Sequence, residues 1–153
     1  MIKTRRAEKT DLKDFAILRF EAQKFASQFD KDILISKDSL KEILKLTENE
    51  FKDPRISYFV AREGDKIVGI AILSVPKEMG KSAYLGELFV EESHRGRGIG
   101  KLLVENAVEI ARKNGLKKFQ LTVAKGNKIG INFYKSLSFV SKRRAYILLE
   151  KVL

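Results

Sequence analysis

Hydrophobic residues recur along the chain with two different spacings, and the spacing separates predicted helices from predicted strands. Apolar residues at every third or fourth position are typical of a helix that packs one face on a core, whereas short alternating or continuous apolar runs are typical of strands. The helical spacing occupies residues 10–25, 39–51, 99–113 and 128–137. The strand patterns occupy residues 2–7, 58–61, 67–72, 83–90, 119–123 and 145–149.

Capping and turn residues support several of these boundaries. Thr10 and Asp11 are expected to cap the first helix, because short polar side chains accept hydrogen bonds from the free N–H groups of a first turn. Asn114 and Gly115 follow the third helix and predict a left-handed cap at its end. The Arg-Glu-Gly-Asp-Lys segment at residues 62–66 predicts a turn, so the strands on either side of it should form an antiparallel hairpin.

The order of the elements predicts the fold class. Strand, two helices, three strands, helix, strand, helix and strand (β-α-α-β-β-β-α-β-α-β) describe a mixed α/β (α+β) fold with a mostly antiparallel central sheet and about four flanking helices. The chain has 153 residues and no low-complexity segment. We therefore expect residues 1–153 to form one domain with a core large enough to leave room for a ligand cleft.

Composition excludes several kinds of chemistry. The chain has no cysteine and a single histidine, His94, so disulfides, thiolate metal sites, a cysteine nucleophile and multi-histidine metal clusters are excluded, and no metal is expected. No apolar run reaches the roughly 18 residues of a membrane span, and the first residues lack the apolar core of a signal peptide. We expect a cytoplasmic protein without a membrane partner.

The charge of the chain favours an anionic ligand. Lys and Arg number 31 against 20 Asp and Glu, which gives a formal net charge of +11. Cations dominate residues 101–135, whereas residues 28–55 carry acids and bases in similar number. A solvated lysine-rich surface also accounts for much of this charge. A nucleic-acid-binding protein is not expected, because the chain has no tryptophan and no recognisable motif of that class.

A glycine-rich segment lies between the predicted strand 83–90 and the predicted helix that starts at residue 99. It contains Arg95, Gly96, Arg97, Gly98, Ile99, Gly100 and Lys101. The N–H groups of a helix N-terminus point outward without partners, and glycines let an anion approach the backbone closely. A ligand-free turn is the alternative. A Walker loop is excluded by Arg95 and Leu102, and a dinucleotide fingerprint starting at Gly96 is excluded by Lys101.

The motif Arg95-x-x-Gly98-x-Gly100 resembles the hallmark of the GNAT superfamily of N-acetyltransferases. The resemblance continues through Asn127, residues 131–135 and Phe139, and covers residues 58–149. The string Tyr-Leu-Gly-Glu-Leu-Phe-Val at residues 84–90 is most similar to the diamine and spermidine/spermine N-acetyltransferase branch.

This resemblance implies that acetyl-CoA is the co-substrate. Phe89 and Val90 would bind its pantetheine arm through their backbone, and residues 95–101 would hold its pyrophosphate. Asn127 would contact the cofactor, and Tyr134 would lie near its sulfur. Arg95, Arg97 and Lys101 could pair with the phosphates, although exposed cations often contribute little. The acids Glu21, Asp30, Asp32 and Glu42 lie where the family forms its acceptor lid.

The chemistry expected is direct attack of a primary amine on the thioester in a ternary complex, since no cysteine is present to carry an acyl group. Tyr134 is the candidate acid for the departing thiolate, with core packing as the alternative. Glu87, the only carboxylate within residues 83–90, is the candidate base. A water chain is its rival, because the related branch carries an acid at the place of Gly86 and strand side chains alternate between faces.

The sequence does not define the acceptor or the oligomeric state. A small-molecule amine, including a diamine or polyamine, and a peptide amine are all compatible with the resemblance, and a homodimer is compatible with such a fold. The alternative to an enzyme is a catalytically silent module that binds acyl-CoA through the same turn.

Overall fold

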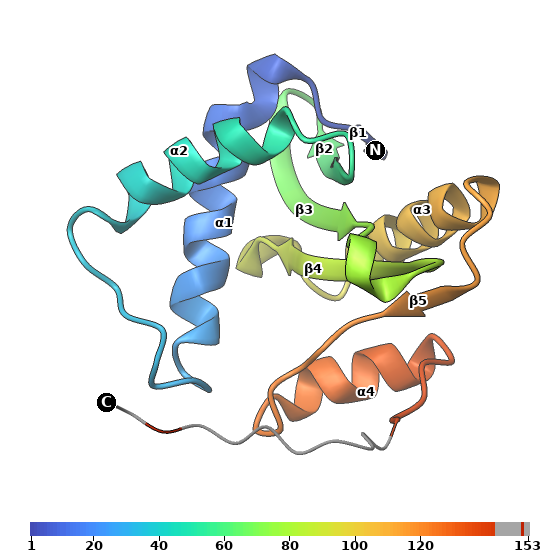
Figure 1. Cartoon of the computed structure of the whole chain (residues 1–153). Coiled ribbons are helices and arrows are strands. Elements are labelled where there is room, and N and C mark those ends of the chain that lie inside the picture. The colour runs from blue at the N-terminus through green and yellow to red at the C-terminus, as the bar shows by residue number, and fades with distance from the viewer. Residues whose placement is uncertain (143–150, 152–153) are drawn as a thin grey trace.

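The computed structural model describes residues 1–142 and residue 151 and contains a five-stranded sheet with helices on both faces (Figure 1). The strands are β1 (Ile2–Arg6), β2 (Ile56–Glu63), β3 (Lys66–Ser74), β4 (Ser82–Val90) and β5 (Lys118–Gln120). The helices are α1 (Leu12–Ala26), α2 (Ser39–Phe51), α3 (Ile99–Lys113) and α4 (Lys128–Ser136), with short 3-10 turns at Lys9–Asp11, Lys77–Met79 and Glu92–His94.

The sheet has the order β1-β2-β3-β4-β5, and every pairing is antiparallel except that of β4 with β5. The predicted fold class, a mostly antiparallel mixed sheet with four helices, is confirmed. The predicted hairpin is also present, because β2 pairs with β3 around a turn in which Gly64 has a φ of +60°. The predicted closing strand 145–149 lies outside the described residues.

Two hydrophobic clusters fill the two faces of the sheet. The first packs α3 against the sheet and includes Leu85 and Leu103. The second packs α1 against the opposite face and includes Phe15 and Ile70. In Figure 1, α1 and α2 lie together on one side of the sheet and α3 lies on the other. Any side chain of β4 therefore faces one of these two helical layers.

A bulge in β4 changes which side chains face which layer. Ile72 of β3 pairs with Glu87, whereas its neighbour Leu73 pairs with Leu85, so Gly86 is an extra residue without a partner. A bulge shifts the alternation of side chains by one position. Leu88 consequently joins the α3-side cluster together with Leu85. Residues 87 and 89 are turned toward α1 and α2.

The end of β4 that follows the bulge has an open edge. β5 pairs with β4 only through residues 118–120 and 82–84, and in the described part of the chain no strand pairs with residues 85–90 on that side. The strand predicted over 119–123 is thus shorter than expected, since residues 121–124 leave the sheet and lead toward α4. The shortening leaves backbone groups of residues 85–90 available for a ligand.

The ends of α3 follow from its flanking glycines. At the C-terminal end the N–H of Leu116 donates to the carbonyl of Ala111 at 3.1 Å and the N–H of Gly115 donates to that of Arg112 at 2.9 Å. With Gly115 at a φ of +73°, this is a Schellman cap, which confirms the predicted end of the helix. At the other end α3 starts directly after Gly98.

Candidate active site

The glycine turn presents unpaired N–H groups at the N-terminus of α3. Gly96 and Gly98 have φ values of +76° and +78°, a conformation that side chains with a Cβ rarely adopt. Nothing lies within 4 Å of where a Cβ would be at either glycine, so both face open space. Among the described residues, the N–H groups of residues 96–101 donate to no backbone or side-chain acceptor. The helix dipole and these donors together favour an anion here.

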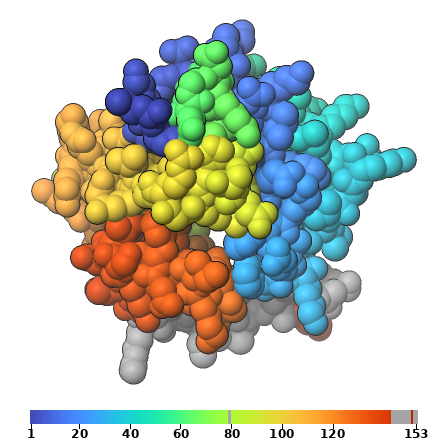
Figure 2. Space-filling view, turned by 180° about the vertical axis from the view of Figure 1, so that it is seen from behind, coloured from blue at the N-terminus to red at the C-terminus, as the bar shows by residue number. Residues whose placement is uncertain are grey.

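Gly100 has a different reason to lack a side chain. A Cβ at this position would lie 3.3 Å from Cζ of Phe133 and 3.8 Å from Cγ2 of Val90. The first turn of α3 is therefore in close contact with α4 and with the end of β4. In the space-filling view a hollow lies between the yellow segment, the orange-red α4 region and the blue end of α1 (Figure 2).

Arg95 is held against the end of β4. Its Nε donates a hydrogen bond of 2.9 Å to the carbonyl oxygen of Val90. Its guanidinium also lies 5.2 Å from the ring centroids of both Phe25 and Phe89. Such cation–π contacts stabilise the position of a guanidinium. Arg95 thus connects the start of the turn to α1, in addition to any contact with a ligand.

The other two cations of the turn make weak, exposed ion pairs. Arg97 lies 3.0 Å from a carboxylate oxygen of Glu63, and Nζ of Lys101 lies 3.8 Å from Glu105 one helical turn later. Each cation keeps about half of its side chain exposed, at 47% and 59%. Exposed pairs of this kind contribute little to stability, so both side chains can exchange their partners for a phosphate.

Asn127 is the N-cap of α4. Its Oδ1 accepts a hydrogen bond of 2.9 Å from the N–H of Gly130. A Cβ on Gly130 would lie only 2.7 Å from Nδ2 of Asn127, so the glycine makes room for the cap. The structure assigns Asn127 a capping role that the motif did not indicate, and a cofactor contact has to use its Nδ2 or its backbone.

Tyr134 lies on α4 within an aromatic cluster. Its ring centroid is 5.0 Å from that of Phe133 and 5.6 Å from that of Phe139, both edge-to-face. Burial raises the pKa of the Tyr134 phenol to about 12. The packing that the sequence left open as an alternative is therefore present, and the same packing keeps the phenol protonated and able to donate.

Glu87 points toward α1, as the bulge requires. Its Oε2 accepts a hydrogen bond of 2.8 Å from Nε of Arg19, and 23% of its side chain is exposed. Burial raises the pKa of the Glu87 carboxyl to about 7, against the opposing effect of the nearby Arg19. A carboxyl with this pKa is suited to accept a proton near neutral pH.

The polar partners of Glu87 were not predicted from the sequence. Arg19 also donates to Glu50 at 2.9 Å, to Tyr58 at 3.2 Å and to Thr47 at 3.3 Å. One signal was available, because Arg19 lies four residues after the buried Phe15 and three before the buried Ala22, on the apolar face of α1. A cation at such a position needs a buried anionic partner.

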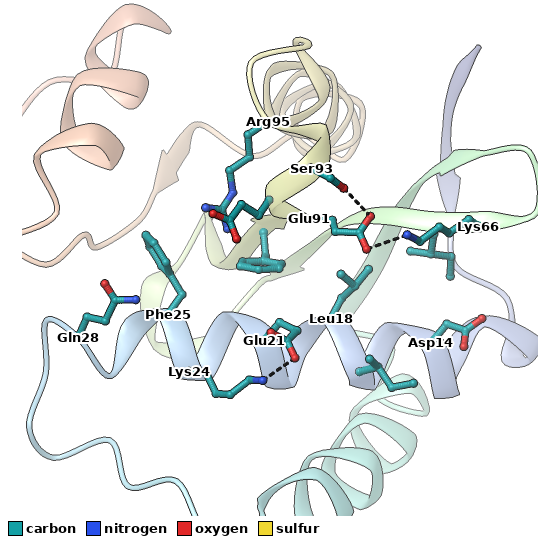
Figure 3. A pocket seen from close by; sticks show the side chains of 14 residues that line it. Asp14, Leu18, Glu21, Lys24, Phe25, Gln28, Lys66, Glu91, Ser93 and Arg95 are labelled. Carbon is teal, nitrogen blue, oxygen red and sulfur yellow. Dashed lines mark hydrogen bonds and ion pairs between the residues drawn. The ribbon is translucent and has the colours of Figure 1, made fainter.

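A second concave region lies beside this site. A groove of about 1250 Å³ runs along α1 toward the end of β4 (Figure 3). It is lined by charged and apolar side chains, among them Asp14, Glu21, Lys24, Phe25, Phe89 and Arg95. Neither Glu87 nor Tyr134 lines it, and the glycine turn reaches it only through Arg95. Among the residues of the open edge of β4 and of the glycine turn, Phe89 and Arg95 line this groove.

The acids expected near an acceptor lid are dispersed. Glu21 forms an ion pair of 2.6 Å with Lys24 in the groove. Asp30 and Asp32 lie in the exposed connection from α1 to α2, and Glu42 is exposed on α2. The structure does not gather them around Glu87.

Two further findings concern the described part of the chain only. Residues 1–142 contain no group of three or more His, Asp or Glu side chains arranged to hold a metal ion. The helices described here are also too short or too polar to cross a lipid bilayer.

An open strand edge that ends in an anion-accepting helix N-terminus suits a protein that binds an extended, phosphorylated ligand. Residues 21–139 match the acetyltransferase (GNAT) family, and the chain therefore belongs to that family. It is 34% identical over 152 residues to an uncharacterized N-acetyltransferase of Methanocaldococcus jannaschii, a match that covers 93% of this chain and 63% of that protein.

One further similarity covers a shorter part of the chain, and another concerns the fold. A thialysine N-epsilon-acetyltransferase of Mus musculus is 36% identical over 58 residues, which is 38% of this chain and 34% of that protein. The fold superimposes with a TM-score of 0.76 on an aminoglycoside N-acetyltransferase solved with coenzyme A, covering 99% of this chain and 96% of that chain at 18% identity. At this identity the second similarity shows the fold alone.

Proposed function

We propose that this protein transfers an acetyl group from acetyl-CoA to a primary amine by direct attack in a ternary complex. The observation that carries the proposal is the glycine turn: Gly96 and Gly98 are in left-handed conformations, free N–H groups follow them, and the open edge of β4 lies beside them. The turn would hold the pyrophosphate, and the backbone of Phe89 and Val90 would bind the pantetheine arm. Family membership and the coenzyme A bound to a structural neighbour support the same cofactor.

In the proposed reaction Glu87 and Tyr134 act from opposite faces of the sheet edge. Glu87 faces the α1 layer, whereas Tyr134 packs with the α3-side cluster. Glu87 takes one proton from the acceptor ammonium, and the amine nitrogen attacks the thioester carbonyl to form a tetrahedral adduct. The C–S bond then breaks as Tyr134 donates its proton to the departing thiolate, and the remaining excess proton of the nitrogen passes through water to the Tyr134 oxygen, which leaves the amide and the free thiol. Holding the two reactants in contact supplies much of the rate increase.

The acceptor that we propose is a small-molecule amine or a peptide amine, without a narrower identity. A diamine or polyamine acceptor rests on the motif at residues 84–90 and on a thialysine-acetylating relative that matches only 58 residues. Gly86, where the related branch has an acid, is exposed at the bulge, and a Cβ there would meet only ordinary contacts of 3.9 Å or more. A cytoplasmic location is part of the same proposal.

The test compares acetyl-CoA binding by the wild type and by Gly98→Asp in a calorimetric titration. An aspartate at residue 98 would place a carboxylate in the open space that the pyrophosphate needs. Gly64→Asp is the matched control, because Gly64 also has a positive φ, of +60°, and open space around it, but lies in the β2–β3 turn.

We expect micromolar binding by the wild type and by Gly64→Asp, and its loss in Gly98→Asp. Absence of wild-type binding would overturn the proposal. Binding without turnover of any amine in a broad panel would instead favour a silent acyl-CoA-binding module.

A further inference from the structure

A compact polar cluster fills the space where α1, α2, β2 and β4 meet. Arg19 lies at its centre with 14% of its side chain exposed. Its Nε donates to Oε2 of Glu87, while its Nη1 donates to Oε2 of Glu50. The hydroxyl of Tyr58 donates to the same oxygen of Glu50 at 2.6 Å, and Tyr58 is itself stacked on Phe15 with a centroid distance of 4.4 Å. Arg19 is therefore fixed from three elements.

This cluster holds Glu87 by one oxygen only. Oε2 is bound by Arg19, whereas Oε1 forms no hydrogen bond with any described residue. Glu50 is likewise held by a single oxygen, Oε2, which accepts hydrogen bonds from both Arg19 and Tyr58. The two carboxylates thus share one guanidinium, but only Glu87 lies on the strand that continues into the open edge and the glycine turn.

We propose that Arg19 is a positioning residue of the active site: it holds Oε2 of Glu87 while Glu50 and Tyr58 hold Arg19, which leaves Oε1 to receive the proton of the acceptor amine. This inference rests on the proposed function. In the step itself an N–H bond of the ammonium breaks, an O–H bond forms at Oε1, and the electron pair stays on the nitrogen for attack on the thioester.

Substitutions of the two charged groups around Glu87 should shift its pKa in opposite directions. The titratable groups that face it from the described elements are Arg19 on α1, Glu50 on α2 and Tyr58 on β2. Burial raises the pKa of Glu87, Arg19 lowers it, and Glu50 raises it. Removing the positive charge should therefore raise the pKa of Glu87, and removing the charge of Glu50 should lower it.

The experiment uses the substitutions Arg19→Gln and Glu50→Gln with two readouts. The first is the titration of the Glu87 carboxyl by carbon-13 NMR of the full chain, assigned with Glu87→Gln and independent of turnover. The second is the acid limb of kcat/KM for acetylation of a primary amine. We expect both readouts to move upward by about one pH unit in Arg19→Gln and downward in Glu50→Gln. The KM for acetyl-CoA should stay unchanged.

Glu50→Gln keeps the test valid if Arg19→Gln does not fold, and a third variant, Arg19→Lys, separates charge from geometry. Arg19→Gln leaves Glu50 and Glu87 without their cation and is at risk of unfolding. Glu50→Gln keeps the acceptor oxygen for Tyr58 and tests the proposal alone if Arg19→Gln does not fold. Arg19→Lys restores the charge without the two-partner geometry, so it should keep the pKa of Glu87 near its wild-type value but lose kcat, because one ammonium replaces two separate nitrogen donors.

The outcomes separate this inference from the proposed function. Wild-type protein that acetylates no amine overturns the proposed function, and the positioning role with it. Wild-type turnover combined with an acid limb that moves in neither variant, or moves in the same direction in both, overturns the positioning role of Arg19 alone.

Discussion

Arg95 and Val90 are joined by a hydrogen bond of 2.9 Å from the Nε of the arginine to the carbonyl oxygen of the valine. The two residues lie at the two ends of the connection between β4 and the glycine turn. The bond therefore fixes the direction in which the chain leaves the sheet and enters α3. It also occupies the last carbonyl of β4, next to the edge at which a pantetheine arm would bind.

This contact separates the role of Arg95 from that of Arg97. Arg95→Ala removes the hydrogen bond and the contacts with Phe25 and Phe89, so we expect a lower melting temperature and acetyl-CoA affinity reduced by about tenfold or more. Arg97→Ala removes only an exposed pair with Glu63, and we expect an unchanged melting temperature. Thermal unfolding and titration at two salt concentrations test both.

The salt dependence of the acetyl-CoA affinity is the control for the comparison of Arg95→Ala with Arg97→Ala. If Arg97 binds phosphate as a point charge, the affinity of Arg97→Ala should depend less on salt than that of the wild type. Equal melting temperatures for Arg95→Ala and the wild type would contradict the structural role of Arg95.

The contact between Gly100 and Phe133 predicts a coupled pair of substitutions. Gly100→Ala places a methyl group 3.3 Å from Cζ of Phe133, so the ring must move by a few tenths of an ångström, which we expect to cost about 1 kcal/mol in the free energy of unfolding relative to an unhindered alanine in the helix. Phe133→Leu shortens the side chain that clashes. In the double variant the cost of the alanine should largely disappear, as urea unfolding of the four proteins in a double-mutant cycle would show.

If the effects of the two substitutions on the free energy of unfolding were simply additive, residues 100 and 133 would not interact in the way proposed. Because Tyr134 is next to Phe133, the shift should also lower kcat in Gly100→Ala, and the double variant should recover part of it.

The acid role of Tyr134 predicts a pH profile. Tyr134→Phe keeps the ring among Phe133 and Phe139 but removes the proton, so we expect kcat to fall about 100-fold with little change in acetyl-CoA affinity. Burial raises the pKa of the phenol to about 12, so the wild type should show no loss of kcat from Tyr134 between pH 8 and about pH 10. Steady-state kinetics over this pH range are the measurement. If Tyr134→Phe had the kcat of the wild type, Tyr134 would not be the acid and would have only a packing role.

The sequence predicted much of the fold because its signals are local. The hairpin turn around Gly64, the left-handed cap at Gly115 and the glycine turn depend on conformations that few residues adopt, so a glycine in the right place is informative. The apolar spacing located α1, α2, α3 and α4 within a few residues. It failed at the end of β5, where residues 121–123 continue the alternation of a strand but leave the sheet, because strand pairing depends on a neighbour distant in the sequence.

The candidate site was only partly accessible to such reasoning. The face on which Glu87 lies depends on the bulge at Gly86, which follows from the register between β3 and β4 and from no single residue. The partners of Glu87 come from residues 19, 50 and 58, which are brought together only by the packing of α1 and α2 on the sheet. A motif over residues 84–100 contains none of these positions.

Asp11 provides the last prediction, because the residue expected to cap α1 has a different function. It is 3% exposed and accepts hydrogen bonds from Arg5 at 2.7 Å and from the N–H of Glu8 at 2.7 Å, and it lies 3.3 Å from Arg62. Burial opposes the charged form, but the hydrogen bonds from Arg5 and Glu8 outweigh it and lower the pKa of Asp11. Since the folded pKa is below the unfolded value, the stability it contributes is present above about pH 4 and is lost as the pH falls through the folded value.

Asp11→Asn should therefore destabilise the fold by about 2–4 kcal/mol at pH 7, because Arg5 and Arg62 lose a buried anionic partner. The difference between variant and wild type should shrink as the pH falls below about 4, because the Asp11 carboxyl then takes up a proton in the unfolded chain while it is still charged in the folded protein. Urea unfolding at pH 7 and at about pH 3 measures both values. Asp53→Asn is the matched control, since Asp53 pairs with Arg55 only two residues away at 2.8 Å on the surface, and its replacement should change stability far less at pH 7.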